Sequence, residues 1–219
     1  MEQTRIRALW AAGKPVVNGW LSIPSTVTAE INARAGFDSL TVDLQHVLND
    51  YQSALNLLQT ISIGASAPMA RVPWLEPGIV GKLLDAGAVG LICPMINSAQ
   101  DAADLVRFAL YAPDGERSFG PTRAIMAHGP DYPRVANAQI VTFAMVETTR
   151  ALEALDEIVA TPGLTGVYVG PSDLSLSMGH IPKLDHDEPE VVAAIRRILD
   201  AAKTAGIRAG LHCRSPEYA

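Results

Sequence analysis

Seven short apolar runs alternate with segments of helical periodicity along the chain, and this alternation constrains the fold more than any other feature. The runs are rich in Val, Ile and Leu and lack strict polar–apolar alternation, which is typical of strands buried on both faces of a parallel sheet. We expect strands at Val16–Ser22, Ser39–Gln45, Pro68–Val72, Gly90–Met95, Ile140–Glu147, Gly166–Gly170 and Arg208–Cys213.

Helix-like stretches separate these runs, and glycines 36, 87 and 206 act as stop signals after three of them. We expect helices at Thr28–Ala35, Ser53–Ile61, Gly78–Ala86, Ala99–Leu110, Thr148–Ala160 and Val191–Ala205. Repeated right-handed βα units lead to either an open doubly wound sheet or a closed barrel.

The position of the polar residues favours the barrel. No Gly-rich dinucleotide fingerprint follows the first run, which argues against a nucleotide-binding sheet. Polar side chains instead lie at the carboxyl ends of several runs, where (β/α)8 TIM barrels build their active sites. These residues are Asp43, Gln45, His46, Arg71, Glu147 and Asp173. We therefore predict one α/β barrel domain over residues 1–219.

The barrel pattern stops one unit short. No eighth strand and final helix follow Cys213 within the 219 residues, so we expect them to be missing from the given chain. The segment Pro113–Arg134 has no clear periodicity and several Gly and Pro residues. We expect it to form a long functional loop above the barrel mouth.

Composition limits the partners and the compartment. The net charge is −6 with both signs interspersed, which gives no reason to expect nucleic acid or an anionic membrane as a partner. No signal peptide and no apolar stretch of about 18 residues is present, so a cytoplasmic location is predicted. The two cysteines, Cys93 and Cys213, match no zinc-ligand spacing and are expected to be free buried thiols.

Two carboxylates are candidate metal ligands. Glu147 closes one run, and Asp173 follows the next in Gly170-Pro171-Ser172-Asp173. In a barrel they would be neighbours, and two oxygen ligands with room for water suit Mg²⁺ or Mn²⁺. The alternative is that Glu147 begins a helix and Asp173 caps one.

The chain also offers an acid–base group and an anion-binding group. His46 follows Asp43, and a histidine near a carboxylate suits general base catalysis. Arg71 lies inside an apolar run, where it needs an anionic partner. That partner could be a keto-acid oxygen or, alternatively, Asp43. The turn at Gly170 could direct the N–H groups of Ser172 and Asp173 at a carboxylate.

An ordered set of segments resembles the class II pyruvate aldolases of the 4-hydroxy-2-oxoheptanedioate (HpcH/HpaI) family. The resemblance covers nearly the whole chain. It is carried by Gly36–Asp38, Val42–His46, Arg71–Pro73, Leu83–Ala88, Pro94–Met95, Pro113–Gly120, Val146–Thr148 and Val169–Ser175.

The resemblance implies a (β/α)8 barrel that forms a homo-oligomer, a hexamer or trimer, and binds Mg²⁺, Mn²⁺ or Co²⁺ through Glu147 and Asp173. It further implies that Arg71 stabilises an enolate, that His46 works with Asp43 in proton transfer, and that the substrate carboxylate rests on Ser172 and Asp173. The expected substrates are a small 2-oxoacid and an aldehyde. No Schiff-base lysine is needed, because a metal and an arginine place positive charge where negative charge develops.

Two departures from the family pattern concern substrate choice. Many members carry glutamate where this chain has Gln45, and glutamine where it has Met145. We expect Gln45 to contact substrate, and hydroxypyruvate as well as pyruvate to be a donor. An oxaloacetate decarboxylase or a macrophomate synthase-like enzyme would use the same enolate. The third hypothesis is a barrel that binds a ligand without turnover. The polar groups at the strand ends argue against it.

Overall fold

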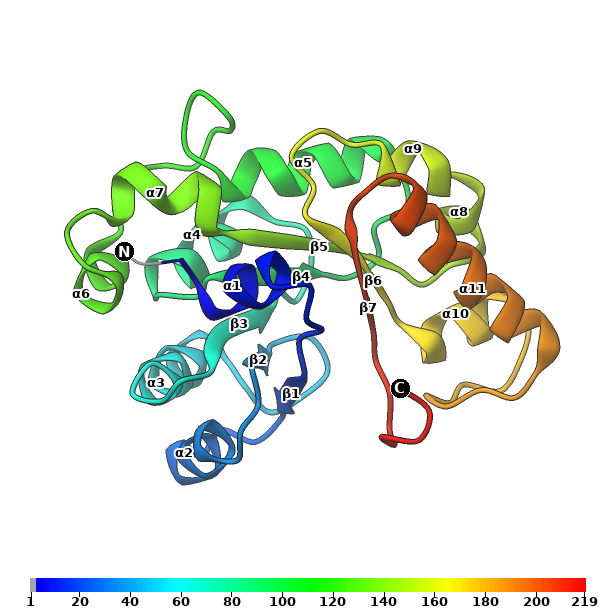
Figure 1. Cartoon of the computed structure of the whole chain (residues 1–219), viewed down its shortest axis with the longest axis horizontal. Coiled ribbons are helices and arrows are strands. Elements are labelled where there is room, and N and C mark those ends of the chain that lie inside the picture. The colour runs from blue at the N-terminus through cyan, green and yellow to red at the C-terminus, as the bar shows by residue number, and fades with distance from the viewer. Residues whose placement is uncertain (1–2) are drawn as a thin grey trace. The chain divides into compact units, whose positions relative to one another are not determined.

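The computed structural model describes residues 3–219, and helices and strands alternate along them (Figure 1). The chain separates into two compact units. The first unit contains the residues up to Leu91 together with Arg107–Val141, and the second contains Ile92–Val106 together with Thr142–Ala219. The single domain over residues 1–219 stays a prediction.

The first unit contains three parallel strands that pair in chain order. They are β1 (Asn18–Leu21), β2 (Ser39–Asp43) and β3 (Ala67–Arg71). Helix α1 (Arg5–Ala11) precedes them, and α2 (Thr26–Arg34), α3 (Tyr51–Ile61) and α4 (Pro77–Asp85) follow them in turn. Figure 1 shows α2 and α3 side by side, in agreement with their contacts. Every residue of β2 and β3 is buried, as expected of strands inside a parallel sheet.

One face of β1 and β2 carries a ladder of polar side chains. The Asn18 Oδ1 atom accepts hydrogen bonds from Ser39 Oγ at 2.8 Å and Thr41 Oγ1 at 3.0 Å. Because side chains alternate between the two faces of a strand, Trp20 and Asp43 lie on this same face, two residues further along each strand. The ladder therefore leads to the carboxyl ends of the strands.

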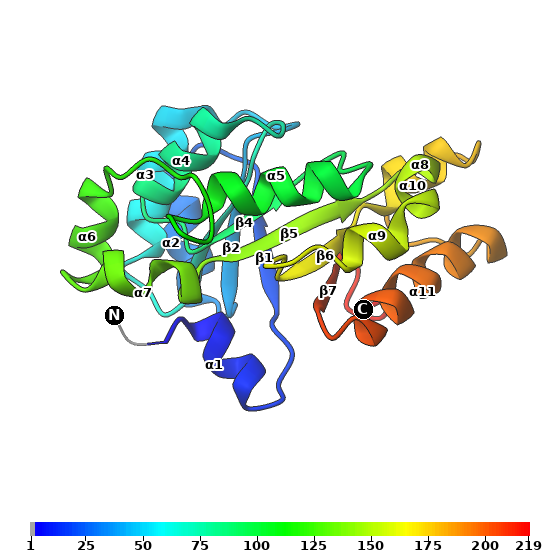
Figure 2. The same cartoon turned by 90° about the horizontal axis from the view of Figure 1, so that it is seen from above.

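The second unit repeats the pattern with β5 (Val141–Val146), β6 (Gly166–Val169) and β7 (Arg208–Leu211), again parallel and in chain order. Its helices are α8 (Thr149–Glu153), α9 (Leu155–Val159), α10 (Pro171–Ser177) and α11 (Pro189–Thr204). Figure 2 shows α11 beside β7, which it contacts. With β4 (Gly90–Cys93) and α5 (Ala99–Ala109), all seven predicted strands are confirmed, and the parallel α/β class with them.

Two predictions about helices are corrected. The single helix expected over Thr148–Ala160 is broken at Ala154, which ends α8 and begins α9. The predicted loop Pro113–Arg134 contains α6 (Thr122–His128) and the start of α7 (Tyr132–Gln139).

The location of this segment is also corrected. Arg123 donates a hydrogen bond to the Ala86 carbonyl, and His128 Nε2 lies 3.0 Å from the Gly87 oxygen. Both carbonyls precede β4, so α6 lies at the amino ends of the strands of its unit and not above the mouth at their carboxyl ends. Helix α5 runs back from the carboxyl end of β4, so the segment that follows α5 begins near the amino ends of the strands.

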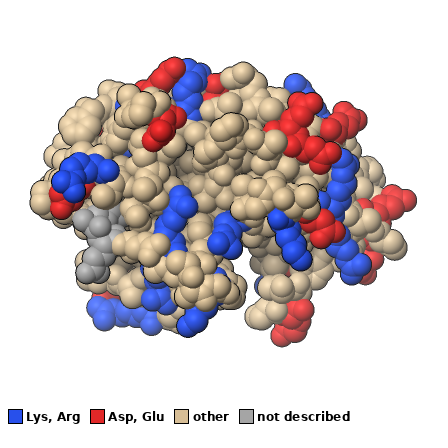
Figure 3. Space-filling view, turned by 45° about the horizontal axis from the view of Figure 1, so that its top comes forward, with Lys and Arg blue, Asp and Glu red and all other residues tan. Residues whose placement is uncertain are grey.

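Charged side chains are mixed on the surface. Figure 3 shows acidic and basic residues interspersed with others on the face that it draws. Exposed pairs such as Arg34–Glu30 and Arg107–Glu116 join opposite charges. No helix within residues 3–219 has the length and apolar character needed to cross a bilayer.

A buried arginine organises the segment before α6. Arg117 is 6% exposed and donates to Asp85 Oδ1 at 2.6 Å and to the Tyr132 hydroxyl at 3.0 Å. Its guanidinium carbon also lies 4.4 Å from the centre of the Tyr111 ring. Burying a guanidinium is costly unless it is paired, and these contacts, which leave Nε without a partner among the described residues, connect the segment to α4 and α7.

We expect Arg117→Ala to lower the free energy of unfolding by about 3 kcal/mol, because it removes one partner of a buried network. The control is Arg34→Ala, which breaks only the exposed pair with Glu30 and should cost about 0.5 kcal/mol or less. Urea denaturation measures both losses. Equal losses would show that Arg117 makes no special contribution.

Candidate functional site

A buried ion pair joins the carboxyl ends of β2 and β3. Arg71 Nε donates to Asp43 Oδ1 at 2.8 Å, and Arg71 Nη2 lies 2.6 Å from Asp43 Oδ2. The two residues are direct partners in the parallel register, and their exposures are 7% and 2%. The internal pair proposed for Arg71 is therefore present, with the two-pronged geometry that arginine favours.

The pair leaves part of the guanidinium available. An arginine has five N–H donors, and two of them point at Asp43, so three remain. The Arg71 Cζ atom lies over the Trp20 ring, 4.7 Å from the ring centre. Arg71 is thus fixed in orientation and can still bind an anionic oxygen.

His46 does not pair with Asp43 as the sequence suggested. Both Asp43 oxygens face Arg71, and Oδ1 also accepts from the Gln45 backbone N–H at 2.9 Å. His46 lies in the bend after β2, is exposed, and has no hydrogen bond to any residue that the structure describes. The cross-strand arginine is a stronger partner for the carboxylate because it offers two charged donors.

Asn49 shapes the loop that carries His46. Its side-chain N–H groups donate to the backbone oxygens of Leu21, at 2.9 Å, and Asp43, at 3.0 Å, which connects the ends of β1 and β2. The relative exposure of Asn49 is only 8%. The loop at residues 44–50 is therefore anchored at its far end and directs His46 toward solvent.

Glu147 lies at the corresponding strand ends of the second unit. It is 1% exposed, and its Oε1 atom accepts from the Met95 backbone N–H at 2.7 Å. Val146 pairs with Val169, so Glu147 lies beside Gly170, where an added Cβ atom would be 2.2 Å from Glu147 Oε2. A side chain at residue 170 would therefore displace the Glu147 carboxylate from its present position.

The loop after β4 is shaped to reach Glu147. Met95 has a φ of 55°, in the left-handed region that non-glycine residues rarely adopt. Asn97 stabilises this conformation, because its side-chain N–H donates to the Met95 oxygen at 2.8 Å and its Oδ1 atom accepts from the Thr148 hydroxyl. Strain of this kind is often retained at functional sites.

Asp173 and the turn before it lie at the start of α10. The side chain is half-buried, and its carboxylate has no hydrogen-bonding partner among residues 3–219. The N–H groups of Ser172 and Asp173 belong to the first helical turn, which has no acceptor within the helix. Gly170, Ser172 and Asp173 therefore present donors and one carboxylate beside the end of β6.

The cysteines have no nucleophilic role in this arrangement. Burial, followed by the charges of Glu147 and Asp101, raises the pKa of the Cys93 thiol far above its ordinary value. Both cysteines are free, which confirms that prediction, but Cys213 is only half-buried. Partial burial also raises the pKa of the Cys213 thiol, so both thiols remain protonated at neutral pH.

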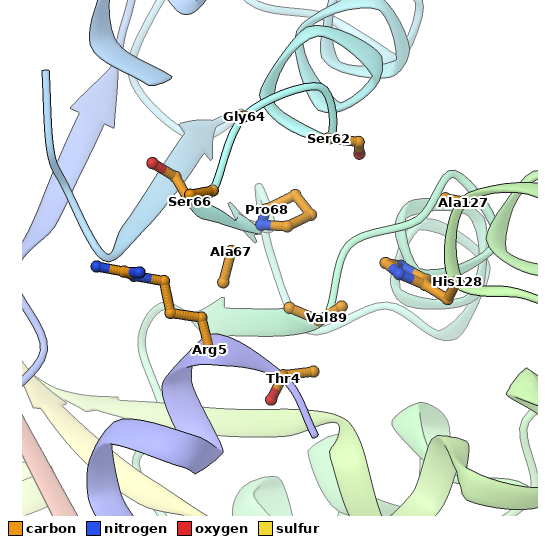
Figure 4. A pocket seen from close by; sticks show the side chains of 11 residues that line it. Thr4, Arg5, Ser62, Gly64, Ser66, Ala67, Pro68, Val89, Ala127 and His128 are labelled. Atoms are coloured by element: carbon orange, nitrogen blue, oxygen red, sulfur yellow. The ribbon is translucent and has the colours of Figure 1, made fainter. Parts of the chain in front are cut away.

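A pocket of about 370 Å³ lies at the opposite ends of the strands in the first unit (Figure 4). Ala67, Pro68 and Val89 form an apolar part of its wall, and α6 contributes His128. Burial lowers the pKa of His128, so this side chain is neutral at pH 7. Arg5 in its lining is already paired with Asp38 Oδ1 at 2.6 Å, and we assign the pocket no function.

These features define an α/β enzyme whose polar groups lie at the carboxyl ends of parallel strands. The chain belongs to the HpcH/HpaI aldolase/citrate lyase family, whose model matches residues 19–211. The predicted family and enzyme class, an aldolase, are therefore confirmed.

Individual relatives agree with this assignment. A hydroxypyruvate/pyruvate aldolase of Rhizorhabdus wittichii is 40% identical over 98% of this chain and 86% of its own length. A 4-hydroxy-2-oxo-heptane-1,7-dioate aldolase of Shigella sonnei is 36% identical, over 95% of this chain and 80% of its own. The crystal structure of an HpcH/HpaI aldolase/citrate lyase family protein from Burkholderia cenocepacia matches with a TM-score of 0.82 and 37% identity, over 89% of this chain and 78% of that one.

Several residues at the strand ends were missed by sequence reasoning. Trp20 and Asn49 contact the Asp43–Arg71 pair or its loop, and Met95 and Asn97 contact or support Glu147. Only Trp20 had a usable signal, an aromatic residue near the end of a predicted strand. Met95 acts through its backbone N–H, and Asn49 and Asn97 bind backbone oxygens, which no side-chain pattern reveals.

We expect Gly170→Ala to lower the free energy of unfolding by about 1–3 kcal/mol, because the new methyl group would collide with the Glu147 carboxylate. The matched control is Gly81→Ala in α4, where the added atom meets nothing within 4 Å. That change should stabilise the protein by up to about 1 kcal/mol through helix propensity. Urea denaturation tests the contrast, and a Gly170→Ala protein as stable as the wild type would contradict it.

Proposed function

We propose that the protein is a divalent-metal-dependent aldolase that cleaves or forms 4-hydroxy-2-oxoacids, with pyruvate or hydroxypyruvate as donor and an aldehyde as acceptor. The observation that carries the proposal is the buried Arg71, held by Asp43 with three N–H groups left for an anionic oxygen. The names of the two aldolase relatives support the donor and the class of product.

The residues present fit a hard cation. Glu147 and Asp173 supply carboxylate oxygens, the donors that Mg²⁺ and Mn²⁺ prefer. Within residues 3–219 no group of three or more His, Cys, Asp or Glu side chains is arranged to hold a metal. Two protein ligands would thus leave positions for water and substrate oxygens. When bound, Mg²⁺, Mn²⁺ or Co²⁺ would polarise the keto group as a Lewis acid.

The chain's own residues supply the remaining functions. The substrate carboxylate would rest on the N–H groups of Ser172 and Asp173, in the turn that begins at Gly170. Arg71 would donate to the keto oxygen, where negative charge develops as the enolate forms. His46, exposed at the end of β2, would move the proton through water, while Asp43 holds Arg71 in place.

Further features of the proposal concern substrate choice and assembly. Gln45 has a buried amide oxygen without a partner among the described residues, and Met145 is buried beside Gly170. These neutral side chains support a donor such as hydroxypyruvate. We also infer a (β/α)8 barrel and a homo-oligomer, supported by the βα order and by the family.

Glu147→Gln is expected to weaken Mn²⁺ binding at least about 100-fold, because a neutral amide is a poor ligand for a hard cation. Isothermal titration measures the affinity, and pyruvate released from a 4-hydroxy-2-oxoacid measures activity before and after chelation. The control is Glu153→Gln, which changes an exposed carboxylate on α8. Activity that survives complete metal removal would overturn the metal-dependent mechanism.

His46→Ala should lower kcat by about 10²–10⁴-fold, the usual contribution of a general base, and leave Mn²⁺ affinity near that of the wild type. His180→Ala is the control, since His180 pairs with Glu190 and belongs to no part of the proposed site. Stopped-flow detection of pyruvate gives the rates. Normal turnover by the His46→Ala protein would remove His46 from the mechanism.

A further inference from the structure

Trp20 is the one aromatic side chain among the described residues that lies against the Arg71 guanidinium, with the ring centre 4.7 Å from Cζ. The contact has a structural basis in the strand register. Trp20 is on β1, in register with Thr41, two residues before Asp43 on the same face of β2. The sheet therefore places the ring, the carboxylate and the guanidinium together at one edge.

The ring and the carboxylate restrict different motions of Arg71. The two hydrogen bonds to Asp43 fix the guanidinium within its own plane. They do less to prevent the plane from tilting about the line that joins it to Asp43. An aromatic ring packed against the guanidinium opposes that tilt and excludes water from the pair, which strengthens the ionic contact.

We propose that Trp20 is a positioning residue for Arg71, which keeps the three remaining N–H groups aimed at the developing enolate oxygen. The inference rests on the proposed aldolase function for its catalytic consequence. Because that oxygen gains charge only as the reaction proceeds, a tilted guanidinium costs transition-state stabilisation more than substrate binding. Loss of the ring should therefore lower kcat and change KM little.

Two substitutions separate the ring's electrostatic effect from its volume. Trp20→Leu keeps an apolar side chain but removes the aromatic face, and should lower kcat by about 30-fold, the equivalent of a desolvated cation–π contact. Trp20→Phe keeps a smaller face and should stay within about fivefold of the wild type. If Trp20 acts through Arg71, its loss should have little further effect in the Arg71→Lys background.

A readout without turnover tests the placement itself. The Arg71 Nε–H resonance, identified by its absence in Arg71→Lys, should exchange with solvent at least about tenfold faster in Trp20→Leu, since the pair is exposed to water. Trp20→Phe should leave the exchange rate close to that of the wild type. Unchanged exchange in Trp20→Leu would overturn the inference, as would kcat losses that multiply fully with those of Arg71→Lys.

The two proposals fail in different ways. A wild-type protein that cleaves no 4-hydroxy-2-oxoacid with metal present would overturn the proposed function and the catalytic part of this inference with it. The exchange measurement would still decide whether Trp20 holds Arg71, because it requires neither metal nor substrate.

Discussion

The buried pair between Asp43 and Arg71 is the interaction on which the first unit's strand ends depend. A charged group inside a parallel sheet costs several kcal/mol unless it is paired, and breaking such a pair typically costs about 3–5 kcal/mol. The pair is possible because β2 and β3 place the two residues opposite each other. The same register that satisfies the charge directs the unused arginine donors to the carboxyl end of the sheet.

The second unit also buries a charged side chain at a strand end, and a different set of contacts stabilises it. Glu147 is as deeply buried as Asp43, and its Oε1 atom is held by a backbone N–H of Met95. Met95 presents that N–H from a left-handed conformation that the Asn97 side chain supports, and Gly170 leaves room for the carboxylate. In each unit, neighbouring residues thus hold a buried carboxylate in place at the end of a strand.

The sequence predicted the strands well because buried parallel strands leave continuous apolar runs, as in Ile140–Glu147. It missed α1, α6, α7 and α10, which are seven or eight residues each and too short to show a clear period. Adjacency along the chain favoured His46 as the partner of Asp43, whereas the sheet register supplies Arg71 from 28 residues away. The left-handed Met95 had no signal, because backbone conformation at a non-glycine residue is set by tertiary contacts.

The proposed function requires this protein to form an enolate of pyruvate with the help of a divalent metal. Exchange of the pyruvate methyl hydrogens with D₂O, followed by proton NMR without any aldehyde, reports enolate formation alone. We predict exchange in the presence of Mg²⁺ and its loss after complete chelation, with recovery when Mg²⁺ is restored. Exchange at the same rate in the chelated protein would contradict the account.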